Sequence, residues 1–164
     1  MTPKQKKIVS AVVVLFVVFI IAFFGFIIYI TFNTSPTVRK KMINHYSNYN
    51  SYVEVYVRIP ETPKKGSELV HIGVEFIGEN ADRFTKNGFG GFCMPASNYD
   101  VMVSNGFNFE DTETVYKFLA SPAIWWDGGQ PFAVAVFSED DSTVYLDYET
   151  GKKNLLYYIK NDMD

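Results

Sequence analysis

Length, composition and charge exclude several classes of protein. The chain has 164 residues, which is room for one ordinary domain and one additional segment. Residues 33–164 carry all eighteen Asp and Glu but only twelve of the fifteen Lys and Arg, so their net charge is −6. This balance argues against nucleic-acid binding, which needs an excess of cations. Cys93 is the single cysteine, which excludes an intramolecular disulfide.

Residues 8–32 predict a transmembrane helix. They contain no charged side chain, and nineteen of the 25 are Ile, Val, Leu or Phe. A helix of that length reaches about 37 Å, enough to cross a hydrocarbon core of about 30 Å. A cleavable signal peptide has a shorter apolar stretch, of about 7–15 residues, before small residues at a cleavage site. We therefore expect an uncleaved signal-anchor that contacts the lipid bilayer.

The charges that flank this segment are nearly balanced. Residues 1–7 form a short basic tail with three lysines directly beside the apolar run, and residues 39–41 place Arg, Lys and Lys slightly farther from its other end. Applied to these flanks, the positive-inside rule favours a cytoplasmic N-terminus. We expect the C-terminal domain to lie outside the cytoplasm, attached to the cell membrane through a polar stalk at residues 33–51.

Residues 52–164 predict a β-rich domain that begins with a hairpin. Residues 52–59 alternate between apolar and polar side chains, and the same alternation returns in residues 70–76. Pro60, Pro63 and Gly66 break the chain between these two runs. Each run is therefore expected to form a strand with one buried face.

The rest of the domain predicts short strands and two helices. A polar loop at 78–91 is expected to lead into a strand at 92–94, which is followed by a small helix at 98–106. A strand at 114–120 and a turn at 125–130 come next. Strands at 132–137 and 143–146, joined by a charged turn, precede a closing helix at 152–160. Asn98 is expected to cap the small helix, and Gly106 to end it. Five or six strands with these helices suit a small, closed or nearly closed barrel.

Two stretches of the sequence carry a resemblance to a known group of domains. They are FCMPASNYDVMVSNGF (residues 92–107) and VYLDYETGKKNLLYYI (residues 144–159). Both resemble segments of small, uncharacterised, membrane-anchored barrel domains of Gram-positive bacteria. The resemblance implies an OB-like β-barrel over about the last 110 residues. It implies no activity, and the chain lacks the N-terminal cysteine of the lipid-anchored members.

The candidate chemical motifs are weak. Residues 87–92 (NGFGGF) are rich in glycine, but no Lys-Ser or Lys-Thr follows them, so a turn into a strand is favoured over a phosphate-binding loop. The acidic residues 139–141 lack the spacing of a calcium loop and are expected at a solvated hairpin tip. Cys93 and His71 are the only conceivable thiol–imidazole pair, although a buried apolar role for Cys93 is more typical. No catalytic residue, metal site or cofactor is predicted.

Trp125 and Trp126 are the most interesting pair for binding. A hairpin between late strands of a barrel often borders the ligand face, and neighbouring indoles there can stack on a sugar or contact a partner protein. The alternative is that one indole packs inward while the other shields the turn or touches the membrane interface. The leading functional hypothesis is thus a membrane-tethered interaction or structural module without enzymatic activity. The alternative is a small-ligand or glycan-binding domain that uses Trp125 and Trp126, and an enzyme is the third possibility.

Overall fold

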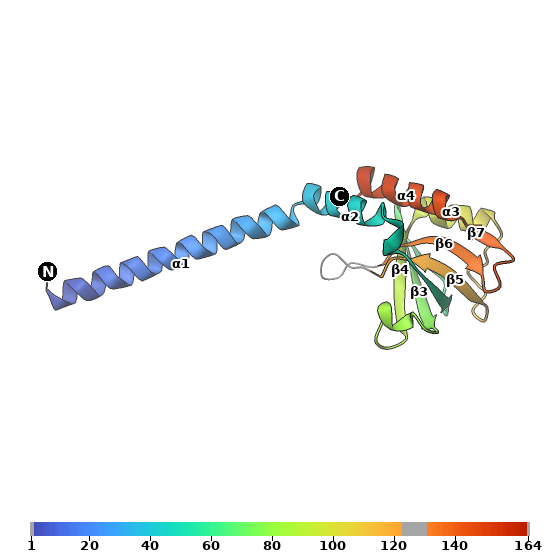
Figure 1. Ribbon diagram of the computed structural model, residues 1–164, viewed down its shortest axis with the longest axis horizontal. Helices are drawn as coiled ribbons and strands as arrows, with labels where there is room; N and C mark the ends of the chain where they lie inside the picture. Colours follow the sequence, from blue (N-terminus) through green and yellow to red (C-terminus); the bar gives the residue numbers. More distant parts are fainter. Residues whose placement is uncertain (1, 123–130, 164) are drawn as a thin grey trace. The chain divides into compact units, whose positions relative to one another are not determined.

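The computed structural model describes residues 2–122 and 131–163 (Figure 1). The chain forms two compact units, Met1–Lys40 and Lys41–Asp164. The fold therefore consists of an N-terminal helical unit and a larger unit that contains the sheet.

The first unit contains one long helix, α1 (Pro3–Asn33). Its start is capped by Thr2, whose side chain accepts from the Gln5 amide at 3.3 Å while the Gln5 side chain accepts from the Thr2 amide at 2.8 Å. All residues of Pro3–Phe32 are exposed, including its most apolar 18-residue window. By length and composition α1 is able to cross a membrane, and the expected span of residues 8–32 lies inside it.

Two short helices lie where the sequence predicted a stalk at residues 33–51. These are α2 (Ser35–Tyr46) and the 3₁₀ helix η1 (Tyr49–Ser51). Within the larger unit, Met42 and Tyr46 of α2 are buried, and the Tyr52 hydroxyl donates to the Tyr46 carbonyl at 2.7 Å. The periodic spacing of Met42 and Tyr46, four residues apart on one helix face, explains why this polar segment packs at all.

The larger unit is built on one curled antiparallel sheet. Its strands are β1 (Val53–Arg58), β2 (Lys64–Lys65), β3 (Leu69–Ile77), β4 (Phe89–Pro95), β5 (Val115–Ala120), β6 (Ala133–Ser138) and β7 (Val144–Leu146). The described residues thus form seven strands, where the sequence predicted five or six. The additional strand is the two-residue β2, which pairs with the first half of β3 while β1 pairs with its second half. The predicted hairpin of β1 and β3 is confirmed.

The sheet closes partway into a half-barrel. Its path is β2-β3-β1-β5-β6-β7, with β4 on the other side of β3. A parallel bridge between Cys93 and Phe132, with the Cys93 amide donating to the Pro131 carbonyl at 3.1 Å, brings β4 to the start of β6. The concave face is filled by apolar side chains, among them the stacked rings of Phe92 and Phe118, whose centroids lie 5.3 Å apart. Burying such aromatic rings is the main source of stability in a sheet of this size.

The small helix α3 (Ala96–Ser104) starts earlier than the sequence predicted. Pro95 is the residue before its first turn, so the prediction that Asn98 caps the helix is wrong. Asn98 lies inside the helix instead, fully buried, and its Nδ2 donates to the Gly151 carbonyl at 3.2 Å. Gly106 has φ = +89°, the left-handed conformation expected just after the helix end.

The closing helix α4 (Tyr148–Asn161) packs with α3 over β6 and β7 (Figure 1). Asp147 caps its first turn by accepting from the Thr150 amide at 3.0 Å, so the helix begins four residues before the expected Lys152. Gly151 lies directly on β6, where a side chain would collide with the Val134 carbonyl. Leu155 and Ile159, four residues apart on one face of the helix, are fully buried.

Candidate functional site

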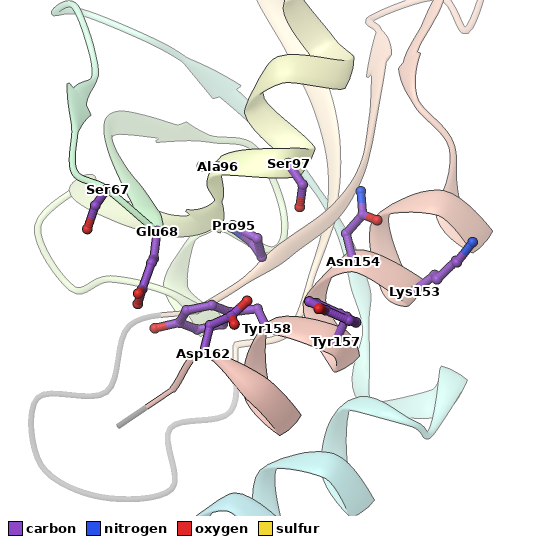
Figure 2. Close-up of a pocket in the computed structure, with 10 residues that line it drawn as sticks. All are labelled: Ser67, Glu68, Pro95, Ala96, Ser97, Lys153, Asn154, Tyr157, Tyr158 and Asp162. Atoms are coloured by element: carbon purple, nitrogen blue, oxygen red, sulfur yellow. The ribbon is translucent and has the colours of Figure 1, made fainter.

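A groove of about 440 Å³ lies in the larger unit between the turn joining β2 and β3, the start of α3 and the second half of α4 (Figure 2). This volume falls within the range of small-ligand sites, about 300–1,000 Å³. Its lining residues come from these three segments: Ser67, Glu68, Pro95, Ala96, Ser97, Lys153, Asn154, Tyr157, Tyr158 and Asp162.

Backbone hydrogen bonds fix one wall of the groove, which is formed by the β2–β3 turn and the start of α3. The Gly66 amide donates to the Leu69 carbonyl at 2.8 Å and closes the turn that carries Glu68. The Ala96 amide donates to the Glu68 carbonyl at 2.8 Å and fastens the first turn of α3 to the same turn. One of the free amides at the helix start is thereby satisfied by the β-turn. The wall is fixed by backbone contacts and does not depend on flexible side chains.

The opposite wall is one face of α4. Lys153 and Asn154 lie one helical turn before Tyr157 and Tyr158, and residues four apart on a helix share a face. Asp162 follows directly after the last helical residue and adds a carboxylate at that end. The predicted helix at 152–160 contains both tyrosines, but no binding face was predicted on it. The pair Tyr157–Tyr158 beside a capped helix was the available signal.

The groove has an acidic end and a basic end. Figure 2 shows Glu68, Tyr158 and Asp162 grouped together, with Lys153 at the other end. Burial raises the pKa of the Tyr158 hydroxyl, and the negative charges of Glu68 and Asp162 are among the groups that raise it further. Tyr158 therefore stays a protonated phenol at neutral pH, able to donate and to accept a hydrogen bond.

The structure brings together Cys93 and His71, the thiol and imidazole singled out in the sequence. They lie opposite each other in the β3–β4 ladder, and the Cys93 Sγ is 3.3 Å from the His71 Nδ1. Burial raises the pKa of the Cys93 thiol to about 11, so the thiol is overwhelmingly protonated at neutral pH. A protonated, buried thiol is a poor nucleophile, because the thiolate is the reactive form.

A second imidazole pair was not expected from the sequence. His45, assigned to the stalk by the sequence analysis, has its Nε2 2.7 Å from the Ser121 Oγ. Ser121 is fully buried. Partial burial of the imidazole lowers the pKa of His45, so the neutral form of its ring is favoured. The contact joins α2 to the segment after β5. A hydroxyl with no exposed surface cannot reach a substrate, so the geometry fits a structural tie.

The remaining sequence candidates have different outcomes. Of the glycine-rich residues 87–92, the first two precede β4 and the last four belong to it, so the strand begins three residues earlier than predicted. In the acidic turn, Asp140 accepts from the Ser142 amide at 3.0 Å and Asp141 pairs with Lys117. Among residues 2–122 and 131–163, no group of three His, Cys, Asp or Glu side chains is placed to hold a metal ion. Trp125 and Trp126 lie outside the described residues, so their binding role stays a prediction.

Comparison with known proteins leaves the groove as the main guide to function. No protein-family model, curated protein or solved structure matches this chain. The resemblance to barrel domains of Gram-positive bacteria, and the OB-like fold that it implies, therefore stay predictions.

Proposed function

We propose that this protein is an uncleaved single-pass membrane protein that presents a non-enzymatic binding domain outside the cytoplasm. The observation that carries the proposal is the exposed apolar surface of α1, of which no residue in the membrane-length stretch is buried within the chain. Exposed apolar surface costs about 25 cal/mol per Å² in water, and a helix of this length and composition removes that cost by entering a bilayer.

The anchor is favoured over a cleaved leader by its length. The apolar stretch of residues 8–32 has 25 residues, whereas the apolar region of a signal peptide has about 7–15. The three lysines in residues 1–7 adjoin the apolar stretch and favour a cytoplasmic N-terminus. The larger unit would then be displayed on the outer side of the cell membrane.

A binding role is favoured over catalysis because the two nucleophilic side chains that lie beside a histidine, Cys93 and Ser121, are buried. The Cys93 thiol is buried and has a raised pKa, and the Ser121 hydroxyl is fully buried beside His45. Nucleophilic catalysis needs an accessible group activated by a base and oriented by a third residue. The groove between α3 and α4 instead offers exposed polar and aromatic side chains, which suits recognition of a partner.

Fractionation and protease accessibility in intact cells test this proposal together. A chain tagged at both ends should remain in the membrane pellet after alkaline carbonate washing, at its full-length mass. External protease should remove the C-terminal tag and spare the N-terminal tag. A shorter, soluble product would show a cleaved leader, and protection of the C-terminal tag would reverse the orientation; either result contradicts the proposal.

Charge variants sharpen the orientation test. Replacing Lys4, Lys6 and Lys7 with Gln should increase the fraction of chains with a protected C-terminal tag, because orientation follows the bias of flanking Lys and Arg. Replacing Lys64 and Lys65 with Gln is the matched control, since both lysines lie in the folded unit, distant in sequence from the apolar stretch. This control should leave the orientation unchanged.

A further inference from the structure

The acidic end of the groove carries two carboxylates without a cation. Neither Glu68 nor Asp162 forms an ion pair with another residue in the part of the chain that the structure describes. Lys153 lines the same groove, but it lies at the far end in Figure 2. Two neighbouring carboxylates favour binding of a positive charge, since their mutual repulsion is relieved when a cation approaches.

A buried phenol points to the same place. Tyr158 is only 9% exposed as a residue, and its hydroxyl has no hydrogen-bond partner among the described residues, although this oxygen is not one of the fully buried unpartnered atoms. Figure 2 shows this side chain directed into the acidic end of the groove, beside Glu68 and Asp162. A phenol that is held in place by burial of its ring and has no partner within the described residues can donate to or accept from a ligand atom in the groove.

The aromatic wall suits the same kind of ligand. Tyr157 is 62% exposed, and it lines the groove between the acidic end and Lys153. The face of a tyrosine ring attracts a nearby cation and provides apolar area for an aliphatic stem. Pro95 and Ala96 offer a further apolar surface on the opposite wall.

We propose that this groove binds a basic side chain, arginine or lysine, from a segment of a partner protein. The cationic head pairs with Glu68 and Asp162 and donates to the Tyr158 hydroxyl, and the aliphatic stem lies against Tyr157. Lys153, at the other end, faces the backbone carbonyls of the partner segment. This inference rests on the proposed binding function and adds the chemical class of the partner.

A titration of the full-length chain tests the site. The protein is placed in nanodiscs of phosphatidylcholine, which carry no net charge and so do not attract the probe. The probe is the blocked tripeptide acetyl-Gly-Arg-Gly-amide, and its neutral counterpart contains citrulline in place of arginine. Ligand-observed NMR gives the dissociation constant of each. The arginine peptide should bind about five-fold or more tightly than the citrulline peptide, the effect of a charge-assisted contact.

Conservative variants locate the binding. Glu68→Gln combined with Asp162→Asn should weaken arginine binding about five-fold, and Tyr158→Phe about three-fold, without altering the circular dichroism spectrum. Glu149→Gln makes the same chemical change on an exposed residue of α4 outside the groove and should leave the affinity unchanged. Lys153→Gln removes a positive charge and should leave the affinity of the arginine peptide equal or higher.

The outcomes separate this inference from the proposed function. Equal binding of the arginine and citrulline peptides, or unchanged binding in the Glu68 and Asp162 double variant, would overturn the basic-side-chain site while the membrane fractionation result stands. Arginine-selective binding by a protein that is found as a cleaved, soluble product would support the site and overturn the anchored topology.

Discussion

The contact between α4 and β6 provides a sharp test of the fold through Gly151→Ala. In an isolated helix this change is favourable by about 1 kcal/mol, because glycine is a poor helix former. Here a Cβ at residue 151 would collide with the Val134 carbonyl oxygen and would lie 2.7 Å from the carbonyl carbon. These are backbone atoms of a central strand, so the helix has to move away from the sheet to relieve the contact.

The expected cost follows from these contacts. Overpacking costs about 1–3 kcal/mol, with the upper end appropriate to a backbone clash. Displacing α4 also weakens the hydrogen bond from Asn98 to the Gly151 carbonyl, which is 3.2 Å long and worth about 1 kcal/mol. After the gain in helix propensity is subtracted, the free energy of unfolding should fall by about 3 kcal/mol. For a domain of this size the melting temperature should drop by about 10 °C.

Thermal unfolding of the full chain in detergent, followed by near-UV circular dichroism, measures this change. Gly25→Ala is the matched control, because Gly25 is also helical and a Cβ there would have no atom within 4 Å. The control should leave the melting temperature of the folded unit unchanged. A melting temperature for Gly151→Ala within about 2 °C of the wild type would refute the close packing of α4 on β6.

Three further predictions concern the cysteine, the helix cap and the buried amide. Burial and a pKa of about 11 should make Cys93 react with iodoacetamide about a hundred-fold more slowly in the folded protein than in urea, measured by mass spectrometry at about pH 8. Asp147→Ala should lower the free energy of unfolding by about 1 kcal/mol at neutral pH. Hydrogen bonds from Thr150 lower the pKa of Asp147 in the folded protein. The stabilisation by its carboxylate is therefore fully present above the unfolded-state pKa and is lost as the pH falls. Urea titrations should show that the difference in unfolding free energy between the variant and the wild type disappears towards about pH 2. Asn98→Asp should cost about 3 kcal/mol or more at neutral pH and clearly less at about pH 4, where the buried carboxyl becomes neutral and can donate to Gly151.

The first hairpin shows why some elements were predictable. Val55, Val57, Val70 and Ile72 alternate with polar residues and are all buried in β1 and β3, because successive side chains of a strand point to opposite faces. Alternation is a local property, and it needs no knowledge of the partner strand. β4 is different: its glycines at residues 90 and 91 show no alternation, so the strand was predicted only from residue 92 onward.

The groove shows the opposite case. Glu68, Tyr158 and Asp162 belong to a turn and to the end of a helix about ninety residues later, and neither segment carries a recognisable binding motif. Their proximity results from α4 packing over the half-barrel beside α3. The pairing of His45 with Ser121, 76 residues apart, arises in the same way. No periodicity along the chain encodes such contacts.

Local chemistry by itself determined the long apolar helix, the alternating strands and the closing helix, because each depends on side chains within a few residues of one another. Only the tertiary structure decided that the sheet closes through the bridge between Cys93 and Phe132 and that Asn98 donates to the Gly151 carbonyl. It also decided which carboxylates lie beside Tyr158. These features depend on segments distant in the sequence, and their spacing is set by backbone packing such as that of Gly151 on Val134. The physical reason is that the hydrophobic effect is non-directional. An apolar pattern shows which face of an element must be buried, but the packing of the whole domain decides which other element covers that face.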